Sequence, residues 1–301
     1  MLILKECGLL KRLSCPKVEI DLKYMKIAAI VILYNPNNSV IDNIKSYVNY
    51  VDLVIAIDNS TQYLDCIEKI KQLSKLEYIS LNGNFGIAMA LNVGIVKAHD
   101  LGCSWMLTMD QDSSFENDII RVYKEYIYSH NTEDIAVLCP IYIYDRHRTR
   151  KQSRYKQVSL VMQSANLLNF KAYEIIGPYN DELFIDCVDY DYCFRIYKKQ
   201  FKIIQCADAK LRHSPAETKI LKLGNVNLIR YGSASPLRYY YQARNLLYLV
   251  RKYKSFKMLG VLLCKLFKIF FLFNNKRKYI LSYRTGIIDC VNNKFGRKVY
   301  E

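Results

Sequence analysis

The signatures of several common protein classes are missing from this sequence of 301 residues. Its ten cysteines form no C-x-x-C pair and are scattered, which disfavours zinc ribbons, thioredoxin motifs and disulfide frameworks and favours reduced thiols in a cytoplasmic protein. There is no G-x-G-x-x-G after the first apolar run and no G-x-x-x-x-G-K-[ST], so NAD-type binding and P-loop chemistry lose their usual support. No charge-free run of 18 apolar residues and no signal-peptide pattern occur, so we expect neither a transmembrane helix nor secretion.

Acidic residues are also scarce relative to basic ones. The chain has 44 Lys and Arg against 28 Asp and Glu, a net charge of +16, which predicts an anionic partner such as nucleic acid, a membrane or a phosphorylated substrate. The last 64 residues hold 15 of the basic residues and only two acidic ones, a net charge of +13. The preceding part is nearly neutral, with 29 basic and 26 acidic residues. We therefore expect the C-terminal region to have an anionic partner of its own.

The first half of the chain alternates buried strands with helices. Continuous apolar, β-branched runs predict strands over residues 26–33, 52–57, 76–81 and 105–109, with helices between them over 40–50, 64–74 and 87–99. This order is typical of a parallel sheet in an α/β protein. Polar clusters follow the strands at Asn35, Asp58-Asn59-Ser60, Asn84-Phe85-Gly86 and Asp110-Gln111-Asp112. Because ligands of open α/β sheets bind beyond the carboxyl ends of the strands, these clusters predict a site.

Two groups of carboxylates could carry chemistry. Asp110 and Asp112 directly follow a predicted strand, and together they could hold Mg²⁺ or Mn²⁺ on a substrate phosphate. The alternative is a turn in which Asp112 and the serines after it cap the next helix. Further on, Asp186, Asp189 and Asp191 fall within six residues at the start of a predicted helix. One of these carboxylates could act as a general base. Alternatively, all three could simply stabilise the N-terminus of the helix through its dipole.

Three further features stand in the second half. Arg195 is four residues after Asp191, a spacing that pairs charges on a helix. His213 follows a predicted strand and is either a structural or a metal-binding residue. The segment R-Y-Y-Y-Q-A-R-N over 238–245 could grip a diphosphate with its arginines or pack as a helix, and Arg244 is the preferred phosphate contact.

These motifs together resemble the inverting family-2 glycosyltransferases of the GT-A fold, in their rhamnosyltransferase-like branch. The matching segments are N-F-G-I-A-M-A-L-N-V-G over 84–94, D-Q-D-S over 110–113, F-I-D-C-V-D over 184–189 and the arginine segment over 238–245. The resemblance extends from about residue 28 to about residue 253. It implies a mostly parallel sheet flanked by helices, and the charge and apolar pattern of the C-terminal residues predicts a basic, amphipathic helical extension after it.

The resemblance also implies roles for individual residues. Asp189 would deprotonate the acceptor, although Val188 stands where many relatives carry Glu. Asp110, Asp112 and His213 would lie at a Mg²⁺ or Mn²⁺ ion, and Asp186, Asp191 and Arg195 would support the acceptor side. The donor nucleotide-sugar would contact Tyr34, Asn35, Asp58, Asn84, Gly86, Asn92, Asp110, Gln111, Asp112 and Arg244.

The function expected from the resemblance is transfer of rhamnose from dTDP-rhamnose, with inversion, to a saccharide acceptor that is lipid-linked, in bacterial surface polysaccharide synthesis. One alternative is a UDP-hexose donor, with specificity set by the variable segment 142–158. The other is a basic protein that binds nucleic acid or a membrane without catalysis. No RRM, KH or helix-turn-helix motif is present, so a nucleic-acid partner is not expected.

The basic C-terminal region contains a long apolar stretch over residues 255–273. On a helix, Lys254, Lys257, Lys265 and Lys268 share one narrow face and apolar residues cover the rest, which is typical of a helix lying in a membrane interface. The alternative is a helix packed on the domain with its lysines in solvent. We therefore expect an N-terminal extension (1–25), a GT-A domain (26–235) and a helical region (236–301) that holds the protein on the anionic inner face of the cell membrane.

Overall fold

The computed structural model describes residues 25–143, 153–213, 217–223 and 226–298. Nearly all of the predicted N-terminal extension (1–25) and the centre of the predicted specificity segment (142–158) lie outside the described residues.

The first half of the sheet is parallel, as predicted. The strands β1 (Ile27–Leu33), β2 (Leu53–Asp58), β3 (Leu76–Ser80) and β4 (Trp105–Asp110) stand in the order β3-β2-β1-β4. They alternate with α1 (Ser39–Lys45), α2 (Cys66–Lys71) and α3 (Ile87–Asp100). Every residue of β1 is buried, so the strand is covered on both faces of the sheet. A continuous apolar run is the sequence that such a strand requires.

The second half of the sheet mixes directions, which the sequence did not predict. β8 (Asn166–Asn169) runs antiparallel between β4 and β6 (Ile135–Ile143), and β9 (Lys202–His213) then runs parallel to β6. The short strands β5 (Ser113–Phe115) and β7 (Tyr155–Val158) both pair antiparallel with β9. The helices of this half are α4 (Ile119–Ser129), α5 (Phe170–Ile176), the 3₁₀ turn η1 (Asp181–Leu183) and α6 (Val188–Lys198).

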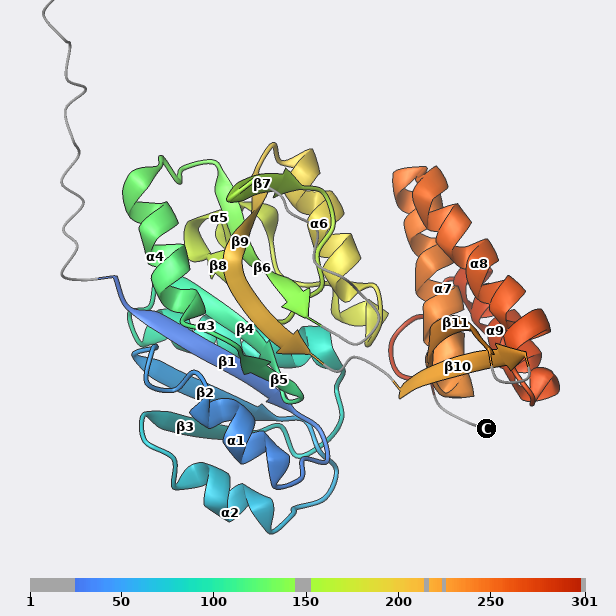
Figure 1. Cartoon of the computed structure of the whole chain (residues 1–301), viewed down its shortest axis with the longest axis horizontal. Coiled ribbons are helices and arrows are strands. Elements are labelled where there is room, and N and C mark those ends of the chain that lie inside the picture. The colour runs from blue at the N-terminus through green and yellow to red at the C-terminus, as the bar shows by residue number, and fades with distance from the viewer. Residues whose placement is uncertain (1–24, 144–152, 214–216, 224–225, 299–301) are drawn as a thin grey trace, which may run out of the picture.

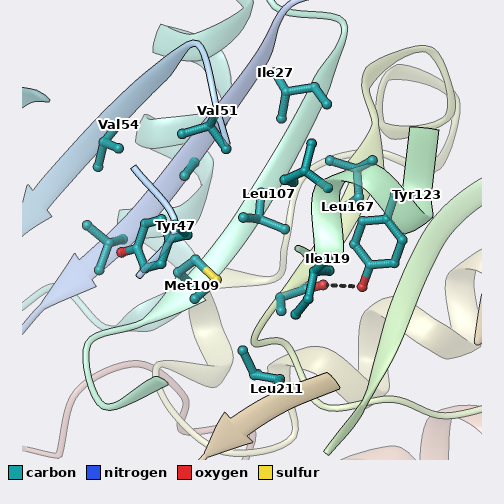
Figure 2. Close-up of a cluster of buried hydrophobic side chains, with 14 of the residues drawn as sticks. Ile27, Tyr47, Val51, Val54, Leu107, Met109, Ile119, Tyr123, Leu167 and Leu211 are labelled. Carbon is teal, nitrogen blue, oxygen red and sulfur yellow. Dashed lines mark hydrogen bonds between the residues drawn. The ribbon is translucent and has the colours of Figure 1, made fainter. Parts of the chain in front are cut away.

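Helices cover both faces of the sheet and create two apolar cores. Alternate β1 residues such as Ala29 and Val31 pack with α1, α2 and α4, while Ala28 and Ile30 pack with α3, α5 and α6 on the other face. Figure 2 shows part of the first core, in which Tyr123 lies among aliphatic side chains. Its hydroxyl donates to the Ala165 carbonyl oxygen at 2.7 Å, so the one polar atom of that ring is satisfied.

The C-terminal part is a hairpin followed by three helices, which stand beside the sheet domain (Figure 1). β10 (Glu217–Leu223) and β11 (Val226–Ser233) are antiparallel and lead into α7 (Pro236–Tyr253), α8 (Phe256–Leu272) and α9 (Lys276–Val291). Their shared core includes Leu246, Leu249, Leu262, Ile269 and Tyr283. None of the helices in the described ranges combines the length and apolarity that crossing a membrane requires.

The lysines of α8 do not form the single exposed face that the sequence suggested. Lys257 is exposed, whereas Lys265 is partly buried with its ammonium 5.4 Å from the centre of the Tyr239 ring. The apolar face is divided too, because Leu262 and Ile269 pack inward while Phe267 and Phe271 are exposed. The helix therefore packs on α7 and α9 and still presents an apolar face outward.

The contact between α7 and α9 depends on Gly286. A Cβ atom there would lie 2.3 Å from the Tyr240 carbonyl oxygen and 3.1 Å from the Arg244 amide nitrogen, both of which are backbone atoms. Backbone cannot swing aside as a flexible side chain can, so the two helices approach this closely only because residue 286 lacks a side chain.

We predict that Gly286→Ala lowers the free energy of unfolding by about 1–3 kcal/mol, the usual cost of overpacking. The matched control is Gly260→Ala in α8, where a Cβ atom meets nothing within 4 Å. That change removes a helix-interior glycine and should stabilise by up to about 1 kcal/mol. Urea denaturation measures both, and equal stabilities of the two variants would contradict the proposed packing.

Candidate active site

A cavity of about 650 Å³ opens at the carboxyl ends of β1, β2 and β4. The sheet forms one wall, and the segment before α6 forms another together with α7 and α8. Predicted site residues that line the cavity are Tyr34, Asn84, Gly86, Asp110, Gln111, Asp112, Asp186 and Asp189. The polar clusters after the strands thus meet at one place because parallel strands end at the same edge.

The D-Q-D segment is fixed against the loop after β1. The Tyr34 amide donates to the Gln111 side-chain oxygen at 2.8 Å, and the Gln111 amide group donates back to the Tyr34 carbonyl at 3.1 Å. The Asn43 amide group donates to the Gln111 carbonyl at 2.8 Å. The alternative of a helix cap is not what this segment forms, because residues 113–115 are strand β5 and Asp118 caps α4.

The second strand contributes Asn59 to the cavity rather than Asp58. Asp58 is 3% exposed, accepting hydrogen bonds from the Tyr78 hydroxyl at 2.6 Å and the Ser60 amide at 2.9 Å. Ser60 in turn accepts from the Asn35 amide at 2.8 Å. Asp58 and Asn35 therefore shape the loops behind the cavity and do not line it.

The segment after β3 needs Gly86 because it meets the loop before α6. Gly86 has φ of 87°, and a Cβ atom there would lie 2.5 Å from the Phe184 carbonyl oxygen. Asn84 and Asn59 are linked side chain to side chain at 3.3 Å beside it. Asn92, also predicted as a donor contact, does not line the cavity and instead holds the backbone of Tyr179 with both ends of its amide group.

Asp189 stands in the cavity at the start of α6. Burial raises the pKa of its carboxyl to about 7, and the neighbouring carboxylates Asp186 and Asp110 act in the same direction. The Tyr190 amide, which donates to Asp189 Oδ1 at 2.9 Å, only partly offsets them. A carboxyl group poised near neutrality inside a cavity is suited to accept a proton from a bound hydroxyl.

The segment before Asp189 is held in an unusual conformation by α7. Phe184, Asp186 and Cys187 have φ of 62°, 64° and 63°, values that non-glycine residues rarely adopt. The buried Asn245 side-chain amide donates to the carbonyls of Leu183, Ile185 and Asp186 at 2.9, 2.8 and 2.8 Å. These bonds stabilise a backbone that would otherwise be costly to keep.

The two arginines of α7 have different positions. Arg244 is 1% exposed, does not line the cavity, and donates to the carbonyls of Leu183 and Gly296 at 2.9 and 2.7 Å. Arg238 lines the cavity and donates two hydrogen bonds, of 2.6 and 2.7 Å, to the Asp186 carboxylate. The phosphate contact that we predicted for Arg244 is thus not supported by its position, and Arg238 is the arginine that a ligand can reach.

Asp191 and Arg195 pair as the spacing predicted, at 2.9 Å, but away from the cavity. Asp191 is fully buried and also accepts from the Tyr253 hydroxyl at 2.7 Å and the Lys252 ammonium at 3.2 Å. This cluster joins α6 to the end of α7. Its contribution is to hold the helix that carries Asp189.

His213 is the last residue of β9 and stands opposite Ser113 in the strand register, next to the D-Q-D segment. Within the described ranges, no three His, Cys, Asp or Glu side chains gather as a metal cage. Asp110 and Asp112 nevertheless offer hard carboxylate oxygens to the cavity, which suits Mg²⁺ or Mn²⁺ that is completed by substrate phosphates and water.

Sequence reasoning did not assign Gln242 or Lys265 to the site, and it preferred Arg244 to Arg238, yet α7 and α8 bring Arg238, Gln242 and Lys265 to the cavity. Arg238 and Gln242 belong to the arginine segment, and their four-residue spacing on one helix face was a usable signal. Lys265 could not be found, because only the packing of α8 turns it toward the cavity.

Two sequence comparisons match this chain to known proteins. The family model described as Glycosyl transferase family 2 matches residues 28–201. The dTDP-rhamnosyl transferase RfbF of Shigella flexneri is 29% identical over 250 residues, which covers 75% of this chain and 80% of the relative.

Solved structures of GT-A glycosyltransferases share the fold at low sequence identity, which confirms the predicted fold class. S. aureus TarS 1–349 in complex with UDP-GlcNAc superposes with a TM-score of 0.54 at 15% identity, over 90% of this chain and 84% of that one. GalNAc-T7 with UDP, GalNAc and Mn²⁺ gives a TM-score of 0.54 at 13% identity over 72% of this chain, which spans about half (48%) of that protein.

The raised pKa of Asp189 predicts how stability depends on pH without ligands. A carboxyl group whose folded-state pKa lies above its unfolded value of 3.8 contributes stability at low pH that is lost as pH rises toward about 7. Asp189→Asn should therefore match the parent protein near pH 4 and exceed its stability by about 2–4 kcal/mol above pH 7.

Urea denaturation across this pH range, in EDTA, measures the difference, and Asp100→Asn, which removes an exposed carboxyl group outside the cavity, is the control. A gap between Asp189→Asn and the parent protein that does not grow with pH would contradict the assigned environment of Asp189.

Proposed function

We propose that this chain, which belongs to glycosyl transferase family 2, transfers rhamnose from dTDP-rhamnose with inversion to a hydroxyl group of a saccharide acceptor. The observation that carries the proposal is Asp189, whose pKa is raised to about 7 inside a cavity that also contains the D-Q-D segment. Similarity to the Shigella dTDP-rhamnosyl transferase supports the choice of donor. A UDP-sugar donor is the alternative, favoured by the fold that the chain shares with a UDP-GlcNAc complex.

In this proposal the donor lies along the strand ends. Tyr34, Asn59 and Asn84 face the part of the cavity nearest β1 and β2, where they can contact the nucleoside. Asp110 and Asp112 would hold Mg²⁺ or Mn²⁺, which supplies positive charge to the leaving diphosphate. Both residues line the cavity, so a diphosphate bound there would complete the ion's oxygen ligands.

Asp189 performs the proton transfer. Its carboxylate takes the proton of the acceptor hydroxyl while that oxygen forms a bond to the anomeric carbon and the bond to the donor diphosphate breaks. A single displacement of this kind inverts the anomeric configuration. The segment that Asn245 and Arg238 hold in place, 183–187, keeps the carboxylate at the boundary between donor and acceptor.

The C-terminal helices would bring the enzyme to a membrane, where a lipid-linked acceptor is found. Exposed apolar side chains on α8 include Phe256, Leu263, Phe267, Phe270 and Phe271. The exposed residues Lys276, Arg277 and Lys278 follow directly at the start of α9. An apolar face beside basic residues fits peripheral binding to the anionic inner face of the cell membrane. The apolar face of α8 disfavours a nucleic-acid partner for this region. The acidic residues of the cavity disfavour a protein without catalytic activity.

The donor and the base are tested together with a panel of dTDP- and UDP-sugars, with and without Mn²⁺, by following release of nucleoside diphosphate. We expect dTDP-rhamnose with Mn²⁺ to be the best donor. Asp189→Asn should lower turnover by about 10²- to 10⁴-fold, the usual contribution of a general base, and leave donor affinity nearly unchanged. The parent rate should fall as pH decreases below about 7, because Asp189 becomes protonated.

Retained turnover in Asp189→Asn would contradict the assignment of the base. Preference for a UDP-sugar would contradict the donor but leave the reaction class in place.

Membrane binding is tested with vesicles of phosphatidylcholine, with and without phosphatidylglycerol. The full chain should sediment with the anionic vesicles, and the double variant Phe267→Ser, Phe271→Ser should bind at least about tenfold more weakly because two large apolar side chains are lost. Tyr197→Ser, which alters a side chain on α6 that is 75% exposed, is the control. Equal sedimentation of all three proteins would exclude α8 as the membrane-binding face.

A further inference from the structure

One basic side chain in the cavity has no role in the transfer described above. Lys265 of α8 lines the cavity beside Asp186 and Arg238. It makes no ion pair or hydrogen bond with any described residue, and its ammonium nitrogen lies 5.4 Å from the centre of the Tyr239 ring. The carboxylate that acts on it, Asp186, is already paired with Arg238. An ammonium group placed partly away from water without an anion is costly, so a site of this kind is suited to an anionic ligand.

The charges around Lys265 divide the cavity into two ends. Asp110, Asp112 and Asp189 make the end nearest the sheet acidic. At the other end the Asp186 carboxylate is already paired with Arg238, whose Nε and Nη2 groups donate to it. The ammonium of Lys265 therefore gives that end a net positive charge.

Burial acts on the ammonium in the expected direction. It lowers the pKa of Lys265, and Lys268 and Arg238 add to that effect, whereas Asp186 opposes it. A bound anion would remove this penalty, which is how an unpaired cation in a cavity gains affinity for a phosphate.

The position of Lys265 separates it from the donor. The proposed donor site is at Asp110 and Asp112, which follow β4, whereas Lys265 is on α8 and interacts with Asp186 in the segment that leads to Asp189. A ligand group at Lys265 is thus on the acceptor side of the base.

The two faces of α8 indicate the kind of acceptor. Lys265 and Phe267 are two residues apart, so about 200° of rotation places them on opposite faces of the helix. One face of α8 meets the cavity while the other is exposed and apolar.

Resting on the proposed function, we propose that Lys265, with Arg238, binds the phosphate of an acceptor whose saccharide is attached to a lipid through a phosphate ester. The lipid would lie along the exposed face of α8, and its phosphate would reach Lys265 at the basic end of the cavity. The saccharide would then extend toward Asp189. The residue thereby selects phosphate-linked acceptors over free saccharides.

The experiment measures binding of geranyl diphosphate and inorganic pyrophosphate by calorimetry to the full chain saturated with dTDP and Mn²⁺, so that the donor diphosphate site is already filled. Lys265→Met should weaken binding of both probes at least about tenfold, the expected loss of one charge-assisted hydrogen bond, and leave dTDP affinity unchanged. Lys265→Arg, which keeps the charge, should bind both probes nearly as well as the parent protein. Lys257→Met is the matched control, because it removes an exposed lysine from the same helix.

Three results would overturn the proposal. Unchanged geranyl diphosphate binding by Lys265→Met would show that Lys265 does not contact the lipid phosphate. If Lys265→Met loses affinity for dTDP to the same extent as for the probes, Lys265 belongs to the donor site. If Lys257→Met loses as much affinity for the probes as Lys265→Met does, the effect is one of general surface charge. If Lys265→Met fails to fold, Lys265→Gln is measured in its place. A parent protein that does not bind dTDP would contradict the proposed function, and the geranyl diphosphate measurements on the same variants would still test Lys265.

Discussion

The side-chain amide of Asn245 is the interaction on which the site depends most. It donates to three backbone carbonyls, those of Leu183, Ile185 and Asp186, and so holds a segment in which three non-glycine residues have positive φ. That segment leads directly into α6 and places Asp189 in the cavity. A strained segment persists only where its surroundings fix it, and here α7 supplies those surroundings. The C-terminal helices are therefore part of the structure that positions the proposed base.

The same packing explains how charges of both signs coexist in one cavity. Asp186 is paired with Arg238, whereas burial raises the pKa of Asp189 and the charges of Asp186 and Asp110 add to that effect. The D-Q-D segment is held separately by the loop after β1. Each charged group is thus positioned by a different element, so the acidic and the basic parts of the cavity are held independently.

Much of the fold could be predicted from the sequence because its signals are local. Apolar runs such as 26–33 and the D-Q-D segment after β4 have the period and the neighbours that buried parallel strands require. The antiparallel strand β8 could not be predicted, because its four residues resemble any short apolar run. Asp58, Arg244 and Lys265 could not be placed either: whether each faces the cavity depends on packing between distant segments, as when Asn245 and Arg244 of α7 bond to carbonyls about 60 residues earlier in the chain.

If Asp189 acts as the base in a single displacement, the reaction inverts the anomeric configuration, and the configuration of the product can be measured. A product made from dTDP-rhamnose and a defined saccharide acceptor can be assigned from the NMR coupling at its anomeric carbon. We expect a configuration opposite to that of the donor, because the acceptor oxygen attacks from the face opposite the leaving diphosphate. A product that retains the donor configuration would require two displacements and would contradict the role assigned to Asp189.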